Sequence, residues 1–387
     1  MIGSPSTNPS TNFIPKLYPM STETKKPKAR VIAFYLPQFH PFKENDEWWG
    51  KGYTEWISVA RARKLFPGHE QPKLPGELGF YDLRLPETRE AQASMAQKYG
   101  VDGFCYYYYR LRKGCNLMDR PLKEVLASGK PDFPFMLCWA NHNWEAKDWN
   151  KHDSYKSRML VRQEYGDEND IRDYFMEVLP YFLDSRYIKE ENCPLFAIYK
   201  PLHVTNMTLM MQIWNNLAKQ YGFEGVKFIA YTEESRVELT KLTSLGFSLV
   251  ISNRMNAIRH NHSQIWRYIN ATFRYVFSVP YVAQYKNIIK ELTSKETLDE
   301  QVIPTVMPNW DPSPRRGSYS HLWINSTPSL FKQHVKDVLS KIKDKQNKLV
   351  FIKSWNEWGE GNYLEPDRKW QSAYLEALQE ARKEMDI

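Results

Sequence analysis

Eight short runs of apolar residues recur along the chain, each rich in β-branched or aromatic side chains. Nearly every position in these runs is hydrophobic, which is typical of parallel β-strands that are covered on both faces. The predicted strands are Arg30–Phe39, Val101–Tyr109, Phe133–Ala140, Leu195–Tyr199, Val226–Tyr231, Ser248–Ser252, Ile303–Pro308 and Leu349–Trp355.

Helical patterns separate these runs, and four of them end just before a glycine, a common residue at the C-terminal end of a helix. The predicted helices are Pro86–Tyr99, Asp119–Ser128, Asp170–Leu183, Thr208–Tyr221, Val237–Leu245, Ser329–Lys345 and Gln371–Glu384. The segment after the sixth strand, 253–300, is longer and less regular.

Strict alternation of strands and helices predicts a parallel α/β fold, and eight strands are the number that closes a barrel. A doubly wound sheet is the alternative, but no GxGxxG turn follows the first strand. We therefore expect an α/β fold of the (β/α)8 TIM-barrel type.

Two connections are longer than ordinary barrel loops. One runs from His40 to Leu85 after the first strand, and the other from Asn253 to about Lys295 after the sixth. Because both follow the carboxyl ends of strands, we expect insertions that wall the active-site face. The first residues are rich in Ser, Thr, Asn and Pro and are followed by a basic stretch, which predicts a disordered basic leader, 1–29. A single catalytic barrel domain, 30–387, is expected to follow.

The composition is that of a soluble globular protein, with 42% apolar and 25% charged residues. The net charge of +8 comes without a zinc-finger, helix-turn-helix or RNA-binding signature, so we expect no nucleic-acid partner.

Since no secretory signal and no apolar run of about 18 residues is visible, we expect a cytoplasmic protein with at most peripheral membrane contact. Four cysteines without CxxC spacing predict reduced thiols, no metal and no cofactor. The oligomeric state does not follow from the sequence.

Polar and aromatic residues cluster at the ends of the predicted strands, where a barrel forms its active-site mouth. Trp and Tyr stack on sugar faces while offering a polar group, so this mixture favours a carbohydrate cleft. The candidate substrate-binding residues at the strand ends are Gln38, His40, Tyr106, Tyr107, Tyr108, Arg110, Trp139, Asn141, His142, Trp144, Tyr199, Tyr231, Glu233, Trp310, Asp311, Arg315, Arg316, Trp355 and Asn356.

The sharpest chemical signal is the carboxylate pair Glu357 and Glu360 after the eighth strand. On one helical turn their Cβ atoms would lie about 5–6 Å apart, and retaining glycosidases hold two carboxyls roughly 5–5.5 Å apart. One of the two must be protonated and the other ionised, so their surroundings must separate their pKa values. Trp355 and Trp358 are candidates to desolvate one of them. The alternative is an acidic first helical turn favoured by the helix dipole.

Arg315 and Arg316 are adjacent and follow the seventh strand. A guanidinium pair suits a carboxylate or a phosphate, so substrate contact is one interpretation. A surface ion pair with Asp311 or with an acidic loop is the other.

Several motifs together resemble the WbsX family. They are Ala33–Pro41 (AFYLPQFHP), Glu44–Gly50 (ENDEWWG), Gly52–Trp56 (GYTEW), Gly79–Arg84 (GFYDLR), Trp139–Asn141 (WAN) and Trp355–Asp367 (WNEWGEGNYLEPD). That family is glycosyltransferase-like and related to the endo-mannosidases of glycoside hydrolase family 99. The resemblance runs from about residue 30 to 384.

The resemblance implies a (β/α)8 barrel that acts at glycosidic bonds without a metal. It assigns Glu360 as general acid/base and Glu357 as the base on the sugar 2-hydroxyl, with a 1,2-anhydro intermediate and net retention. It also adds Trp48, Trp49, Glu55 and Trp56 as substrate-binding candidates. Members of the family commonly belong to surface-polysaccharide gene clusters, which suggests an O-antigen or capsule glycan. The expected partner is an oligosaccharide or polysaccharide, anionic or lipid-linked.

The chain departs from the family pattern at two strand ends. His142 replaces a glutamate of the usual Trp-Ala-Asn-Glu-Asn-Trp, and Tyr108 and Arg110 replace the His and Trp of the usual Tyr-Tyr-His-Tyr-Trp. With Lys113 nearby, these changes suggest a more basic mouth and an anionic sugar or phosphorylated acceptor.

Three functions stay open at this point: a retaining endo-glycosidase or transglycosidase, a glycosyltransferase on the same barrel, and a non-catalytic glycan-binding protein. Neither a Rossmann-like half nor a metal-binding acidic pair for a sugar nucleotide is visible, which favours the first.

Overall fold

Eight parallel strands close into a barrel in the computed structural model, which describes residues 28–147, 157–233, 236–255 and 279–386. Most of the expected leader, 1–27, lies outside the described residues. The strands follow the order β1-β14-β12-β10-β9-β8-β4-β2, and pairing of β1 with β2 closes the ring. They are β1 (Arg30–Tyr35), β2 (Gly103–Arg112), β4 (Phe135–Trp139), β8 (Cys193–Ile198), β9 (Lys227–Thr232), β10 (Leu249–Ser252), β12 (Val302–Val306) and β14 (Leu349–Ile352). All eight predicted strands are confirmed.

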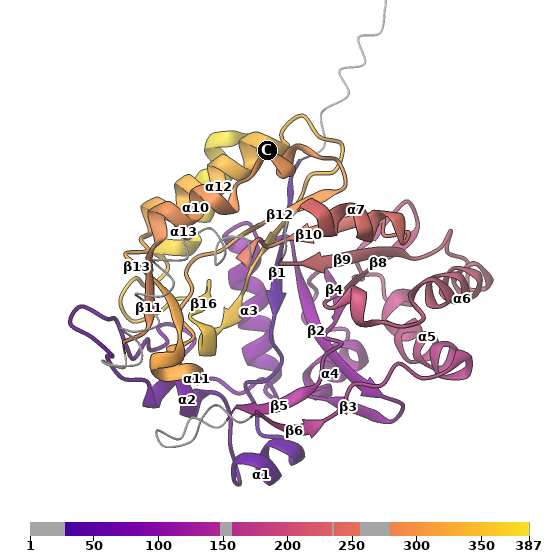
Figure 1. The fold of residues 1–387 in the computed structure, drawn as a ribbon, viewed down its shortest axis with the longest axis horizontal. Coiled ribbons are helices and arrows are strands. Elements are labelled where there is room, and N and C mark those ends of the chain that lie inside the picture. Colours follow the sequence, from indigo (N-terminus) through magenta and orange to yellow (C-terminus); the bar gives the residue numbers. More distant parts are fainter. Residues whose placement is uncertain (1–27, 148–156, 234–235, 256–278, 387) are drawn as a thin grey trace, which may run out of the picture.

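Helices surround the barrel, with α5 and α6 on one side and α10, α12 and α13 on the other (Figure 1). The seven predicted helices are confirmed to within a few residues. The outer helices are α3 (Pro86–Lys98), α4 (Arg120–Ser128), α5 (Glu168–Leu183), α6 (Met207–Gln220), α7 (Arg236–Ser244), α10 (Tyr285–Leu292), α12 (Pro328–Ile342) and α13 (Ala373–Met385).

The strands are apolar at nearly every position because both of their faces are covered. Phe34 points into the barrel, where its ring packs on Tyr107, Tyr231 and Phe351. Its neighbour Tyr35 points outward, and its hydroxyl donates to Gln92 on α3 at 2.6 Å. Alternate side chains of a strand therefore fill the barrel interior and the layer beneath the helices.

Three connections enlarge the face at the carboxyl ends of the strands. The loop after β1 holds α1 (Lys43–Trp49) and α2 (Trp56–Arg61), as the predicted insertion there requires. After β10, part of the second predicted insertion, 256–278, lies outside the described residues, and β11 (Tyr281–Gln284) follows it. A third connection, after β4, was not among the predicted insertions; in it β5 (Trp144–Lys147) pairs antiparallel with β6 (Ser157–Val161).

Short elements complete the described chain. They are β3 (Cys115–Leu117), β7 (Lys189–Glu190), α11 (Ser313–Arg316), β13 (His321–Ile324), β15 (Asn356–Glu357), β16 (Asn362–Tyr363) and the 3-10 turns Pro201–His203, Lys295–Leu298, Gly317–Tyr319 and Trp358–Glu360. All four cysteines are free thiols. Among the helices described, none has the length and apolar character needed to cross a membrane.

The end of β2 differs from the expectation that its polar residues all face the mouth. Tyr107 stacks on Phe34 inside the barrel, so Tyr106, Tyr108 and Arg110 point outward by strand alternation. The ring of Tyr106 lies against Tyr35, a residue that contacts α3, and the ring of Tyr108 stacks on Tyr174 of α5. These three side chains therefore lie beneath the helices and away from the mouth.

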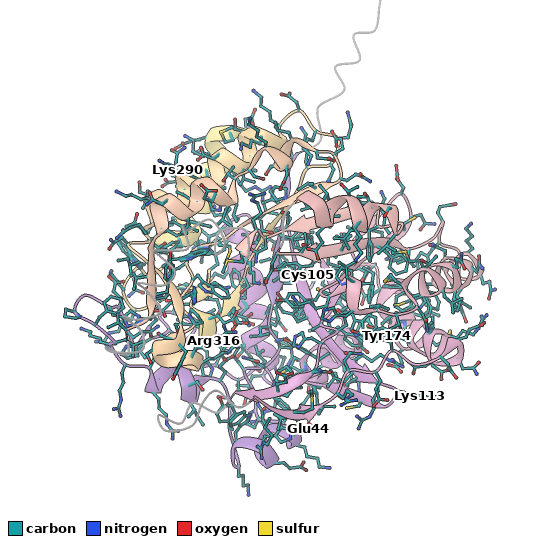
Figure 2. All side chains as sticks on the ribbon, in the orientation of Figure 1. Glu44, Cys105, Lys113, Tyr174, Lys290 and Arg316 are labelled. Carbon is teal, nitrogen blue, oxygen red and sulfur yellow. The ribbon has the colours of Figure 1, made fainter. Side chains whose placement is uncertain are left out.

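Arg110 is buried in this outer layer, where it is paired with carboxylates of α5. Its Nη2 lies 2.7 Å from Asp170 and its Nε 3.2 Å from Glu177. Lys113 forms an ion pair with Asp173 at the periphery of the molecule (Figure 2). Arg110 and Lys113, the two added cations from which a more basic mouth was predicted, therefore do not contribute to the charge of the mouth.

We predict that Arg110→Met lowers the free energy of unfolding by about 3 kcal/mol, because removal of one partner leaves Asp170 and Glu177 without their cation in a partly buried place. Urea denaturation measures the loss. Lys113→Met is the matched control and should leave stability nearly unchanged, since its ion pair is exposed. Equal losses in the two variants would contradict this account of Arg110.

Candidate active site

Three carboxylates surround one guanidinium at the mouth of the barrel. Arg315 of α11 pairs with Glu55, which lies just before α2, through Nε and through Nη2, the latter at 2.6 Å. Its Nη2 also donates to Glu357 at 2.8 Å, and its Nη1 lies 3.2 Å from Glu360. Loops that follow three different strands, β1, β12 and β14, therefore meet at a single cation.

The two glutamates of the pair lie on a tight turn between short strands. Glu357 ends β15, and Glu360 ends the 3-10 turn that leads to Gly361 and β16. Since α13 begins only at Ala373, the alternative of an acidic first turn of a helix is wrong. The turn brings both carboxylates onto Arg315, as their separate contacts with its two terminal nitrogens show.

Close packing fixes this turn. A Cβ at Gly359 would collide with Glu55 Oε1 and lie 2.6 Å from Arg315 Nε, so a glycine is required there. Gly361 has a φ of 62° in the left-handed region, which a glycine adopts without strain. The backbone amide of Asp311 donates to the carbonyl of Glu360 at 2.7 Å and joins the turn to the loop after β12.

The surroundings separate the charges of the pair. Burial raises the pKa of Glu357 well above its usual value, and the nearby Glu360 and Glu55 carboxylates act in the same direction against Arg315. Burial also works to raise the pKa of Glu360, but the cations Arg315, Lys353 and Arg316 outweigh it, and the net pKa is lowered. The surroundings therefore favour the protonated form of Glu357 and the ionised form of Glu360.

Lys353 is a second cation close to the carboxylate pair, and it was not among the predicted site residues. Its Nζ donates to the Tyr231 hydroxyl at 2.7 Å and lies 3.5 Å from Glu233. The same Nζ lies 5.8 Å from the ring centres of Tyr199 and Trp310. Lys353 is the only charged residue within the predicted eighth strand, Leu349–Trp355, and this was the signal that could have identified it.

Aromatic side chains line the mouth beside the carboxylates. Trp144 packs edge-on against Tyr109 with ring centres 5.2 Å apart, and Trp48 stacks on Trp144 at 6.4 Å. His142 lies 5.7 Å from Tyr199 and 6.2 Å from Tyr109. Burial raises the pKa of Tyr109, with Glu357 adding to the rise, so this wall adjoins the carboxylate cluster. Tyr109 was not a candidate, although alternation from the inward Tyr107 identifies it.

Two of the expected substrate-binding asparagines instead clamp backbone at strand ends. The side-chain amide of Asn356 donates to the carbonyl of Leu36 at 3.0 Å and accepts from its amide at 2.7 Å. Asn141 makes the same pair of contacts with Lys200 at 2.8 and 2.7 Å. These clamps hold the loops of neighbouring strands in register around the mouth.

Asp311 is also committed to the protein itself. Its carboxylate accepts from Gln71 at 2.7 Å and from the amide of Ser313 at 3.1 Å, and it lies 3.1 Å from His69 Nε2. Burial works to raise the pKa of Asp311, but His69, the Lys73 charge and the bond from Ser313 hold it below its usual value. Among the described contacts, Arg315 pairs with Glu55, Glu357 and Glu360 and not with Asp311.

The other candidates are divided between the supporting structure and the periphery. Trp56 and Trp355 are buried, the former against Trp358 and the latter against Phe104. Trp139 faces the helix layer, where it packs on Tyr174. Gln38 is buried after β1, and Trp49 is exposed beside Tyr53.

His40 belongs to a separate hollow. It contributes with Phe42, Arg84 and Arg120 to the lining of an open cavity of about 720 Å³. Burial is the main cause that lowers the pKa of His40 to about 4. Within the described ranges, no group of three or more His, Cys, Asp or Glu residues is arranged to hold a metal ion.

Comparison with protein families gives one match over most of the chain. The model of the family described as glycosyltransferase WbsX matches residues 31–378. Two curated relatives, each named uncharacterized protein WxcX and from two strains of Xanthomonas campestris pv. campestris, are 32% identical over 357 residues. These matches cover 91% of this chain but 49% of each relative, so the chain spans about half of their length.

Solved structures with the same fold include glycoside hydrolases. The GH99 endo-alpha-mannosidase from Bacteroides thetaiotaomicron aligns with a TM-score of 0.58 at 14% identity, covering 92% of this chain and 97% of that one. A structure described as a glycoside hydrolase-like protein aligns with a TM-score of 0.60, also at 14% identity, covering 92% and 94%. At this identity the likeness establishes the barrel fold.

We predict that Arg315→Met raises the pKa of Glu360 and raises that of Glu357 further, because each carboxylate loses its nearest cation. The measurement is a pH titration of the glutamate carboxyl carbons by ¹³C NMR, assigned with single Glu→Gln variants. Arg316→Met is the control: Arg316 acts on Glu360 less strongly, so its removal should raise that pKa by a smaller amount. An unchanged Glu360 titration in Arg315→Met would contradict the role of Arg315.

Proposed function

This chain belongs to the WbsX glycosyltransferase family, and we propose that it is a retaining carbohydrate-active enzyme that cleaves or transfers glycosidic bonds of a cell-surface polysaccharide. The observation that best supports this proposal is the pair Glu357 and Glu360, held at the barrel mouth with pKa values shifted in opposite directions. Acid–base work on one bond needs one protonated and one ionised carboxyl. O-antigen or capsule as the glycan stays a prediction from the resemblance, and a cytoplasmic location stays a prediction from the sequence.

The wall beside the pair suits a sugar. Trp48, Trp144 and Tyr109 offer flat apolar faces for a pyranose ring, while His142 and Glu233 offer hydrogen bonds to hydroxyl groups. The GH99 relative is named an endo-alpha-mannosidase, which is compatible with a cleft that takes an internal part of a chain.

The chemistry uses the substrate as its own nucleophile. Glu360 donates a proton to the glycosidic oxygen as that oxygen leaves the anomeric carbon. Glu357 takes the proton of the 2-hydroxyl as O2 closes onto the same carbon and forms a 1,2-anhydro sugar. Water or an acceptor hydroxyl then opens the ring, with Glu360 taking its proton and Glu357 returning one to O2. Two inversions at the anomeric carbon give net retention.

This division of labour requires substrate binding to reverse the order of the two pKa values. The protein surroundings raise the pKa of Glu357 and lower that of Glu360, whereas the reactive state needs the proton on Glu360. Both carboxylates contact Arg315, so a glycan that displaces one of these contacts changes both pKa values together.

Transfer in place of hydrolysis is the second candidate, and the family's description as a glycosyltransferase favours it. The two outcomes share every step up to the anhydro sugar. They differ only in whether water or an acceptor hydroxyl opens the intermediate.

We predict that Glu360→Gln abolishes turnover of oligosaccharides from the producing organism's polysaccharide while binding is preserved. Anomeric signals followed by NMR measure turnover and stereochemistry, and calorimetry measures binding. An aryl glycoside with an acidic phenol should regain activity in Glu360→Gln, because its leaving group needs no proton, but not in Glu357→Gln.

The control is Glu177→Gln on α5, a carboxylate paired with an arginine far from the mouth, which should keep full activity. Rescue of Glu357→Gln instead of Glu360→Gln would reverse the two roles. Full activity of Glu360→Gln on the natural glycan would refute the proposed mechanism. If the native protein bound the glycan without turning it over, the protein would have a binding function only.

A further inference from the structure

Glu365 is a buried carboxylate that lies beneath the candidate active site and has no role in the chemistry above. It is 3% exposed, and three side chains donate hydrogen bonds to it. Gln92 Nε2 lies 2.6 Å from Oε1, while Trp358 Nε1 and the Tyr81 hydroxyl lie 2.7 and 2.9 Å from Oε2. None of its contacts in the described part of the chain is an ion pair with a lysine or arginine.

One of these donors belongs to the catalytic turn. Trp358 stands between Glu357 and the Gly359–Glu360 end of the turn, and it is 1% exposed. Its ring stacks on Tyr363 with centres 3.6 Å apart, and its indole nitrogen is fixed by Glu365. The orientation of Trp358 therefore sets where the backbone presents the two glutamates on either side of it.

A second donor connects Glu365 to the other side of the carboxylate cluster. Tyr81 gives its hydroxyl to Glu365, and its carbonyl accepts from Trp56 Nε1 at 2.8 Å. Trp56 directly follows Glu55, the carboxylate that holds Arg315. The ring of Trp56 also lies 5.5 Å from that of Trp358. Glu365 thus joins the supports of Glu55 and of the catalytic pair.

We propose that Glu365 is a positioning residue: its carboxylate orients Trp358 and Tyr81, and through them holds Glu357, Glu360 and Glu55 in register around Arg315. The inference rests on the proposed function in one respect, that the pair so held is the catalytic one. Among the contacts described, Glu365 does not touch Arg315, and it does not touch the aromatic residues proposed to bind the sugar.

A carboxylate is the group that this place demands. Two oxygens that only accept can serve three donors, and an unmet indole or hydroxyl donor in the interior is costly. A glutamine has one accepting oxygen and one amide nitrogen, so its nitrogen would face a donor. Burial raises the pKa of Glu365 to about 7, while the bonds from Trp358, Gln92 and Tyr81, together with the nearby Trp355, act to lower it. Gln92 is fixed in turn by the Tyr35 hydroxyl, so the groups that face Glu365 are neutral donors.

The kinetic test compares Glu365→Gln with Trp358→Phe and with the double variant. We expect Glu365→Gln to lower kcat on the glycan at least about ten-fold with KM changed less than about two-fold, since the turn and not the sugar contacts is disturbed. Because the two residues act through one bond, the double variant should be no slower than the slower single one. Glu365→Asp, which keeps an acceptor, should recover part of kcat. The proposal would be overturned if the fold-losses in kcat of the two single variants multiplied in the double variant, or if Glu365→Gln raised KM and left kcat unchanged.

A second measurement does not depend on activity. In ¹⁵N-tryptophan-labelled protein, the Trp358 indole signal should move with pH near 7 and lose that titration in Glu365→Gln. The Glu360 carboxyl titration should shift upward in the same variant, because a relaxed turn weakens its contact with Arg315. If both signals were unchanged, the proposal would fail even in an active enzyme, whereas a correct NMR response in a protein without turnover would refute only the proposed function.

Asp102→Asn is the control for a purely structural loss. Asp102 lies just before β2 at the opposite end of the barrel, where it accepts from the amide of Val31 at 2.7 Å and pairs with Arg382. This variant should lower the melting temperature without changing kcat, the Trp358 signal or the Glu360 titration. A loss of kcat in Asp102→Asn equal to that in Glu365→Gln would show that general destabilisation explains both, and would overturn the positioning role.

Discussion

The site depends on the contact of Arg315 with Glu55, Glu357 and Glu360. Three carboxylates brought together away from water would repel one another, and removing them from solvent is costly in itself. One guanidinium that reaches all three offsets both costs and fixes their directions, because its donors lie in a plane. The loops after β1, β12 and β14 must therefore adopt one arrangement together, and the contacts around them stabilise that arrangement.

The supporting contacts are of two kinds. Backbone clamps such as Asn356 on Leu36 and Asn141 on Lys200 hold strand ends in register. Buried acceptors such as Asp311 and Glu365 collect donors from several loops at one point. Each of these side chains replaces hydrogen bonds to water with fixed hydrogen bonds inside the protein. Residue types common in binding sites therefore support the site here and do not face the substrate.

Sequence patterns identified the mouth but not always the residues that face it. Tyr108 and Arg110 lie two residues apart on β2, and both project to the helix layer because side chains of a strand alternate. The inward positions are Tyr107 and Tyr109. The unusual Arg110 therefore concerns the packing of α5, through Asp170 and Glu177, and not the charge of the cleft.

The sequence by itself determined the eight strands, their helices, the barrel and the segment with Glu357 and Glu360. These depend on local periodicity and on the order of elements, which a linear chain already contains. Only the tertiary structure decided that Arg315 joins the pair to Glu55, that Lys353 lies close to the pair, and which glutamate has its pKa raised. Those features arise from residues up to about 300 positions apart, and a pKa depends on burial and on neighbouring charges, which no spacing along the chain specifies.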